Sequence, residues 1–138
     1  MALVNDPVFA QEPKTAGISF GTGSESTVMD PATAAPTTLV TAGSDGAIVT
    51  SVEILAEATS TAEKFVLWVQ PGGSGNWYPI KNVLMSAYTM AATTAQERTT
   101  LIDKNDPGDQ IRLAASDKLG VTHHVDQQSS VFCEYTDM

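Results

Sequence analysis

The stretch from Thr38 to Val69 constrains the fold of this chain most, because three β-type runs follow one another there with short polar turns between them. Side chains along a β-strand point alternately to its two faces. In the second run this alternation predicts one face made of Ile48, Thr50, Val52 and Ile54 and another made of Val49, Ser51, Glu53 and Leu55. The third run, from Phe65 to Gln70, alternates in the same way. The stretch therefore predicts an antiparallel β scaffold, and it carries no group of reactive side chains.

Turn signals recur at the spacing of short strands through the rest of the chain. Gly43 to Gly46 predicts a tight turn, and the Gly-rich loop 71–76 is expected to close a β-hairpin with the strand that begins at Trp77. Further strands are predicted over residues 97–102, 109–115, 121–125 and 131–135. The segment 83–96 could form one or two helical turns, although its threonines argue equally for a strand. About eight short strands with frequent turns predict an all-β protein, an antiparallel β-sandwich or a jelly-roll-like barrel.

Residues 1–36 differ from the rest because they hold four of the seven prolines and one short strand-like run, Gly17 to Phe20. Proline fixes φ and removes a ladder donor, so this segment cannot form a central strand or a long helix. Its apolar side chains leave two alternatives, a loose tail and an extended arm that folds along a neighbouring subunit. We therefore divide the chain into an extended Pro/Gly-rich N-terminal arm, 1–36, and an antiparallel β-sandwich domain, 37–138.

The charge of the chain excludes several classes of partner. Sixteen acidic residues face seven basic ones, which gives a net charge of −9. That sign opposes binding to nucleic-acid phosphates and to anionic membranes. No apolar run approaches the ~20 residues that a membrane-spanning helix needs, and the N-terminus lacks the features of a secretion signal. We expect a soluble protein made in a cytoplasm, with no nucleic-acid or membrane partner.

The residues that usually carry chemistry are few and isolated. Cys133 is the single cysteine, and its place in an alternating run predicts a buried structural thiol. His123 and His124 point to opposite faces of a regular strand, so they cannot chelate one metal ion and are predicted to be surface or interface residues. No Gly-x-Ser-x-Gly elbow marks a nucleophile, and neither Gly-rich loop ends in the Gly-Lys-Ser/Thr of a phosphate-binding loop. We expect no catalytic residue, no cofactor and no metal site.

The acidic segment 103–109 superficially matches a calcium-binding loop. However, the fifth position is Pro107, which offers no side-chain oxygen, and the twelfth position is Ala114 instead of a bidentate acid. Asp, Asn, Pro and Gly are the residues that form turns. The segment is therefore predicted to be a turn between strands.

Three aromatic residues flank the Gly-rich loop. Trp68 lies in the third β run and is predicted to be buried, whereas Trp77 and Tyr78 must face opposite ways in an extended chain, so one of them is expected at the surface. Aromatic residues are enriched at protein interfaces. Together with the apolar residues of the arm they form our candidate interface, which comprises Leu3, Val4, Val8, Phe9, Trp77 and Tyr78.

Two segments together resemble a group of small β-sandwich proteins of tailed-phage virions. The stretch Thr38–Val69 resembles their opening strands, with a Thr-Leu-Val-Thr-Ala-Gly strand, a Gly turn and a Val/Ile-rich strand. The segment Asp106–Ser116 is similar to their later strand, in which Gly-Asp is followed by Ile-Arg-Leu and Ala-Ser. The resemblance covers about two thirds of the chain, from Thr37 onward. It implies a virion structural role without catalytic residues, as in capsid decoration (cement) or head accessory proteins.

From this resemblance we expect a capsid decoration protein that binds the outer surface of a tailed-phage head and stabilises contacts between major capsid subunits. It would be assembled in the host cytoplasm, with the major capsid protein as partner and a homo-oligomer, favoured to be a trimer, as its working form. Two alternatives remain open. One is a neck or tail accessory structural protein, and the other is a carbohydrate-binding β-sandwich module that uses Trp77 and Tyr78.

Overall fold

The structure is a computed structural model, and it describes residues 12–21 and 35–138 of the chain. Its regular elements are nine β-strands and two short 3-10 helices. The strands are β1 (Glu12–Phe20), β2 (Thr37–Thr41), β3 (Ala47–Ala56), β4 (Glu63–Gln70), β5 (Tyr78–Met85), β6 (Thr99–Ile102), β7 (Ile111–Leu113), β8 (Lys118–His123) and β9 (Ser129–Asp137). The 3-10 helices are η1 (Pro71–Gly73) and η2 (Pro107–Asp109).

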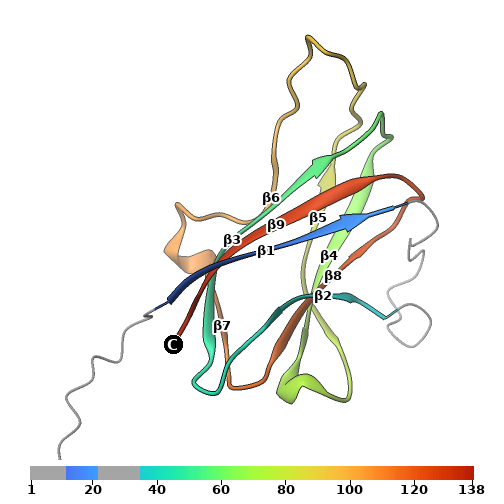
Figure 1. Ribbon diagram of the computed structural model, residues 1–138. Coiled ribbons are helices and arrows are strands. Elements are labelled where there is room, and N and C mark those ends of the chain that lie inside the picture. The colour runs from blue at the N-terminus through green and yellow to red at the C-terminus, as the bar shows by residue number, and fades with distance from the viewer. Residues whose placement is uncertain (1–11, 22–34) are drawn as a thin grey trace, which may run out of the picture.

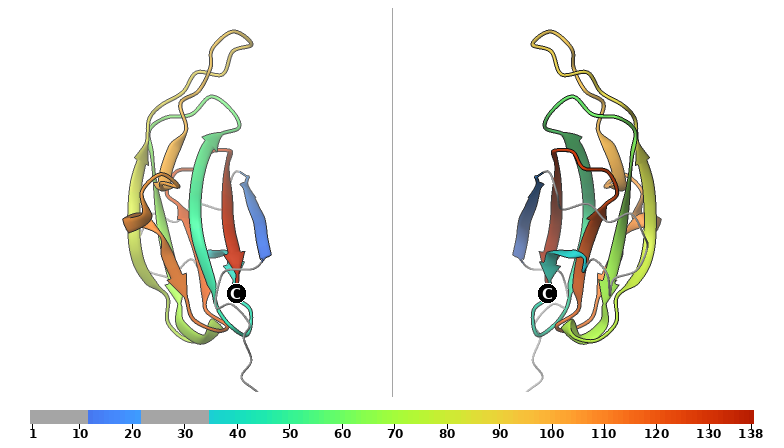
Figure 2. Two further views of the ribbon diagram at one scale, coloured as in Figure 1. Left: turned by 90° about the vertical axis from the view of Figure 1, so that its left-hand side faces the viewer. Right: turned by 90° about the vertical axis from the view of Figure 1, so that its right-hand side faces the viewer.

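The strands form two antiparallel sheets that pack face to face (Figures 1 and 2). Sheet A has the order β1-β9-β3-β6, and β7 also pairs with β3. Sheet B has the order β2-β8-β4-β5. The prediction of an all-β antiparallel sandwich is confirmed.

The strand order identifies the sandwich as a jelly roll. Both β6 and β7 pair with β3, β6 along Val52–Ile54 and β7 along Ala47–Val49, so they act as one strand that the turn at 103–110 interrupts. With β6 and β7 counted as one, the eight strands divide into two four-stranded sheets, and consecutive strands lie in different sheets except for the β4–β5 hairpin, as expected of two Greek keys. Every strand pairing among the described residues is antiparallel.

The core lies between the two sheets. Its largest side chains have no solvent exposure at all, and each such apolar side chain contributes about 1.5–3 kcal/mol by leaving water. They come from both layers: Val49, Val52, Ile54, Leu101 and Ile102 from sheet A, and Phe65, Leu67, Leu119 and Val121 from sheet B. The predicted burial of Trp68 is also confirmed, since its side chain is only 2% exposed.

A β-bulge in β3 corrects the predicted alternation of this strand. The register against β9 shifts between Val49 and Ser51, so two residues there face one on β9. As a result Val49 and Val52 both point into the core, although the regular alternation places them on opposite faces. Thr50, at the bulge, donates a hydrogen bond from its hydroxyl to the Glu134 carbonyl at 3.1 Å.

The strand β1 changes the predicted division of the chain. The short run predicted at Gly17–Phe20 is the end of a nine-residue strand that pairs along its whole length with β9. Phe20 is 4% exposed and belongs to the core. Residues 12–20 are therefore part of the sandwich, as an edge strand, whereas most of the proposed arm, residues 1–11 and 22–34, lies outside the described residues.

The β4–β5 pair confirms the predicted hairpin across the Gly-rich loop, which contains η1. After Met85 the chain leaves the sheet and returns at Thr99 without forming a helical turn. This connection projects beyond the end of the sandwich (Figure 1). One isolated bridge, between Ser60 and Tyr88, ties its base to the β3–β4 connection.

We expect Gly46→Ala to lower the free energy of unfolding by about 2 kcal/mol, because a side chain is strained at its positive φ of 92°. A Cβ there would also press on the backbone carbonyl of Leu113. Gly72 has a similar φ of 68° with no atom near the Cβ position, so Gly72→Ala is the matched control and should cost less. Urea denaturation measures the free energy of unfolding of both variants. An equal decrease for Gly46→Ala and Gly72→Ala would contradict the predicted effect of the contact with Leu113.

Candidate interaction surfaces

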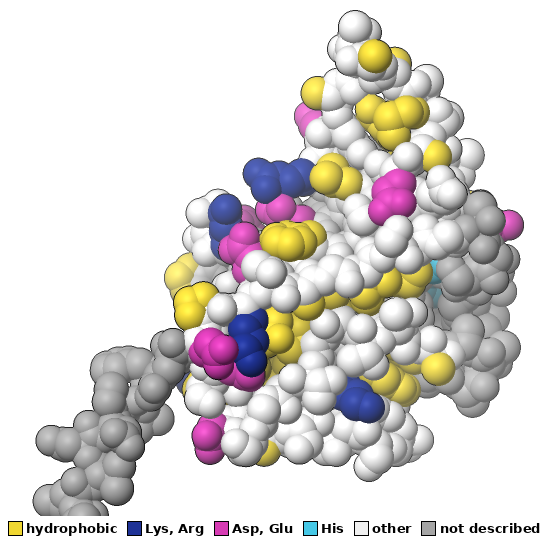
Figure 3. All heavy atoms as spheres, viewed as in Figure 1, with side chains coloured by type: hydrophobic (Ala, Val, Ile, Leu, Met, Phe, Trp, Pro, Cys, Tyr) yellow, Lys and Arg dark blue, Asp and Glu magenta, His cyan; other side chains and the backbone are white. Residues whose placement is uncertain are grey.

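The outward side of sheet A carries an apolar patch. Phe132 on β9 is 49% exposed and Leu55 on β3 is 37% exposed. Phe132 is paired with Glu53 on one side and with Gly17 on the other, while Leu55 is paired with Ser130. The two apolar side chains are therefore diagonal neighbours on one face. Figure 3 views the molecule from this side and shows mostly uncharged side chains with apolar ones among them.

A second surface lies along β5, the edge strand of sheet B. Tyr78 and Ile80 are 54% and 44% exposed, and with Val69 and Ile111 they line a groove of about 540 Å³ that runs toward η2 and β7. The bulge between β4 and β5 falls at Ile80, between the pairs Leu67–Lys81 and Trp68–Pro79. We call this surface the β5 groove.

The polar rim of the β5 groove is held by one ion pair. Lys81 contacts the Asp109 carboxylate, whose second oxygen accepts a hydrogen bond from the Asp103 amide at 2.8 Å. The hydrogen bond from Lys81, followed by that of the Asp103 amide, lowers the pKa of Asp109. Gln110 and Arg112 complete the rim. The groove thus combines an exposed aromatic ring with ordered polar groups.

The structure separates the two aromatic residues of the candidate interface. Tyr78 is exposed in the β5 groove, whereas Trp77 is half-buried on Gly120. A Cβ at Gly120 would lie 2.8 Å from the Trp77 ring and 2.9 Å from Pro36, so only glycine fits under this indole. The other four residues of the candidate interface, Leu3, Val4, Val8 and Phe9, lie outside the described residues.

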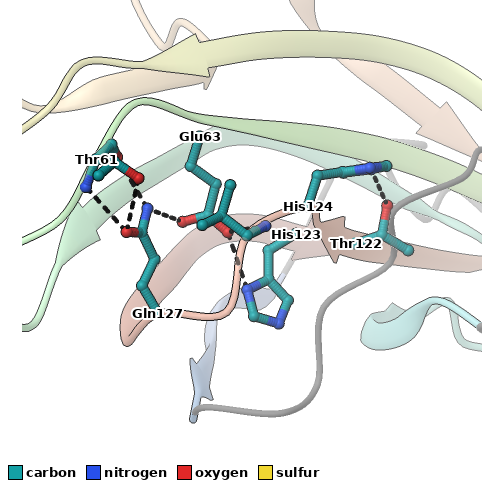
Figure 4. A network of polar contacts seen from close by, with 7 residues as sticks. Thr61, Glu63, Thr122, His123, His124 and Gln127 are labelled. Carbon is teal, nitrogen blue, oxygen red and sulfur yellow. Dashed lines mark hydrogen bonds and ion pairs between the residues drawn. The ribbon is translucent and has the colours of Figure 1, made fainter.

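A buried polar network joins the start of β4 to the β8–β9 connection (Figure 4). The Glu63 side chain is fully buried, and its Oε1 lies 3.0 Å from Nδ1 of His123 and 3.3 Å from the Val125 amide nitrogen. Its Oε2 accepts a hydrogen bond of 2.8 Å from Gln127, and the Gln127 amide also bonds both backbone groups of Thr61. The network satisfies a carboxylate that would be costly to bury alone.

The position of His123 corrects the prediction that both histidines are surface or interface residues. His123 is 1% exposed and stacks on Phe20 of β1, with 4.3 Å between ring centroids. His124 is half-buried on the other face, where its Nε2 lies 3.3 Å from the Thr122 hydroxyl. Burial, together with the nearby Lys64 charge, lowers the pKa of His124. The predicted opposition of the two side chains is confirmed, but His123 is part of the core.

The acidic segment 103–109 forms a turn, as predicted. Asp103 accepts a hydrogen bond from the Asn105 amide at 2.9 Å, and Asp106 accepts one from the Gly108 amide at 3.0 Å at the start of η2. These are the local bonds that make Asp a turn residue. Across residues 12–21 and 35–138, no three His, Cys, Asp or Glu side chains gather as a metal site would require.

Cys133 is fully buried between the sheets, as predicted. Burial raises the pKa of its thiol to about 12, with a smaller contribution from the Glu134 charge. The thiolate is the reactive form, so the thiol should stay protonated and inert at pH 8. We expect a thiol reagent such as iodoacetamide to label the protein in urea and not in native buffer. Rapid labelling of the native protein would contradict this expectation.

The outward position of Phe132 and the Glu63 network were not singled out from the sequence. Phe132 could have been found, because the inward prediction for Val131, Cys133 and Tyr135 leaves Phe132 on the opposite face. The Glu63 network has no such signal, since Glu63 and Gln127 are 64 residues apart and only the fold brings them together.

Comparisons with known proteins supply no family for this chain. No family model matches the sequence, and no curated protein matches it. Among solved structures, a match is the TNF protein Eiger from S. frugiperda, with 11% sequence identity and a TM-score of 0.45 over 93% of this chain and 94% of that one. No helix in the described part of the chain is long and apolar enough to cross a membrane.

Proposed function

We propose that this protein is a structural component of a tailed-phage virion, a decoration protein on the outside of the head. The observation that supports this proposal best is that most of the exposed large apolar side chains project from strands at the edge and outer face of the sandwich. Phe132 and Leu55 form one such patch, and Tyr78 and Ile80 form the other. Apolar side chains that project from stable strands provide ordered contacts for a protein partner.

The β5 groove is the proposed contact with the major capsid protein. Tyr78 supplies a large apolar surface with a polar end, and Gln110 supplies an amide that can donate to and accept from backbone partners. Tyrosine is enriched among the residues that dominate binding energy. Repetition over the symmetric shell makes a contact of modest affinity effective.

The negative charge supports an outer location in this proposal. A chain with a net charge of −9 is repelled by packaged DNA, whereas it is compatible with a surface that faces solvent. The resemblance of Thr38–Val69 and Asp106–Ser116 to virion β-sandwich proteins points in the same direction. A homo-oligomer, favoured to be a trimer, would present the β5 groove of each copy to the shell.

The copy number in purified phage particles tests this proposal. Quantitative mass spectrometry with isotope-labelled peptides should find hundreds of copies per particle for a decoration protein, against about six to twelve for a neck or tail accessory protein at a symmetric ring. Absence from the particles would overturn both. Tyr78→Ala should weaken binding to purified capsid shells, and Leu84→Ala, at an exposed β5 position outside the groove, is the matched control.

Features of the β5 groove also support carbohydrate binding as a second candidate function. Tyr78 offers an exposed ring on which a sugar could stack, and Gln110 and Arg112 lie in the same groove. This candidate now rests on Tyr78 alone, because Trp77 is packed on Gly120. A glycan array with Tyr78→Ala as the control protein distinguishes it from capsid binding.

A further inference from the structure

The outward side of sheet A has the charge pattern of a contact between copies. Its charged side chains are Glu53, Glu57, Glu134, Arg98 and Arg112, three acids and two bases, which leaves a net charge of −1 on a chain of −9. Two of these charges are neutralised locally, because Arg98 donates to Glu53 at 2.8 Å. A face with a net charge of −1 repels a second copy only weakly, although the whole chain carries −9.

The same face has an apolar centre that stands above small residues. Phe132 is flanked by Gly17 on β1, which has no side chain, and Leu55 is flanked by Ser130 on β9. Thr15 and Ser19 extend the uncharged surface along β1. The Phe132 ring thus has small uncharged residues on its β1 side and the Glu53–Arg98 ion pair on its β3 side. An aromatic anchor with polar groups around it is the usual anatomy of an interface.

Two unpaired charges of opposite sign accompany this centre. Within the described residues, neither the Glu134 carboxylate nor the Arg112 guanidinium has an ion-pair partner within 4.0 Å. Glu134 lies on β9 beside Phe132, and Arg112 lies on β7 at the opposite edge of the sheet. Glu57 likewise has no ion-pair partner among the described residues, but it accepts a hydrogen bond from the Ser19 hydroxyl at 2.8 Å. Glu134 and Arg112 are therefore the acid and the base that a second copy of this face can pair.

We propose that the outward side of sheet A binds a second copy of this chain, with Phe132 as the anchor and Glu134 of one copy paired with Arg112 of the other. This inference deepens the proposed function by naming the surface that joins the copies. It uses Arg112 at the rim of the β5 groove and leaves Tyr78 and Ile80 of that groove free for the capsid. It concerns the isolated protein, so its failure can be told apart from failure of capsid binding.

The mass of the isolated protein tests the proposal. Light scattering and sedimentation velocity from about 1 to 100 µM, a range that covers weak to moderate dissociation constants, should show an oligomer at the upper end. Phe132→Ser should raise its dissociation constant at least about tenfold, as loss of a central aromatic anchor does. Leu84→Ser is the matched control, because Leu84 is 66% exposed and lies in the other sheet.

Charge exchange tests the pairing of Glu134 with Arg112 separately. Glu134→Arg and Arg112→Glu should each weaken the oligomer, and the double variant should restore it, because each new charge again meets its opposite. Circular dichroism confirms that each variant is folded. A monomeric wild type over the whole range would overturn the proposal, as would an oligomer that is indifferent to Phe132→Ser. In either case the copy number in virions would still test the proposed function.

Discussion

Replacing Glu63 with alanine is expected to lower the free energy of unfolding by about 3–5 kcal/mol, because it leaves two buried polar groups without their partner at about 1–3 kcal/mol each. The change leaves the His123 ring and the Gln127 amide without the carboxylate that both contact. Both groups are buried, so water cannot replace the lost partner without opening the structure. Urea denaturation followed by circular dichroism measures the loss.

Two further variants make this result interpretable. Glu63→Gln keeps the size of the side chain and one acceptor oxygen, so it should cost less than Glu63→Ala. Glu97→Ala removes an exposed carboxylate and should stay within about 0.5 kcal/mol of the wild type. A loss below about 1 kcal/mol for Glu63→Ala would mean that the network does not hold the β8–β9 connection against β4.

Replacing Trp68 with alanine is expected to cost about 3–5 kcal/mol, the range for deleting a buried aromatic side chain. Trp68 is 2% exposed although it lies on the face of β4 opposite Phe65 and Leu67, so sheet B is covered on both faces at this point. Its indole nitrogen donates a hydrogen bond of 2.9 Å to the Thr122 hydroxyl.

The hydrogen bond and the packing of Trp68 can be measured separately. Trp68→Phe keeps most of the apolar volume but loses the indole donor. It should therefore lower the free energy of unfolding by about 1 kcal/mol for the lost hydrogen bond, in addition to the loss caused by the smaller ring. Thr122→Val removes the acceptor and also the contact with His124. If Trp68→Ala and Trp68→Phe destabilised the protein equally, packing of the ring would not be the larger contribution.

The two exposed patches lie on different sheets, which is important for assembly. A protein that binds both its own copies and a large shell needs surfaces that can be occupied at the same time. The Phe132 patch belongs to sheet A, and Tyr78 and Ile80 belong to β5 of sheet B. Variants at Phe132 and at Tyr78 should therefore separate self-association from capsid binding.

Local patterns in the sequence predict most of the strands, but they do not predict which strands lie next to one another. The hairpin between β4 and β5 followed from a Gly-rich loop between two alternating runs, and the inward position of Cys133 followed from alternation in β9. The sequence does not predict which side chains of β3 face the core on both sides of Thr50. The bulge at Thr50 arises from the pairing of β3 with β9, about 84 residues away. The prediction of His123 as a surface or interface residue is wrong, because its buried partner Glu63 lies on another strand and no local pattern indicates that contact.

An all-β, acidic chain with antiparallel strands and a buried thiol follows from the residues alone, because side-chain alternation, turn residues and net charge are local or summed properties. Three features depend on the three-dimensional arrangement: residues 12–20 belong to the sandwich, Glu63 and His123 meet in the core, and Trp77 packs on Gly120 while Tyr78 remains exposed. Each of these depends on which strands become neighbours. Strand neighbours are set by long-range pairing between segments that no local pattern connects.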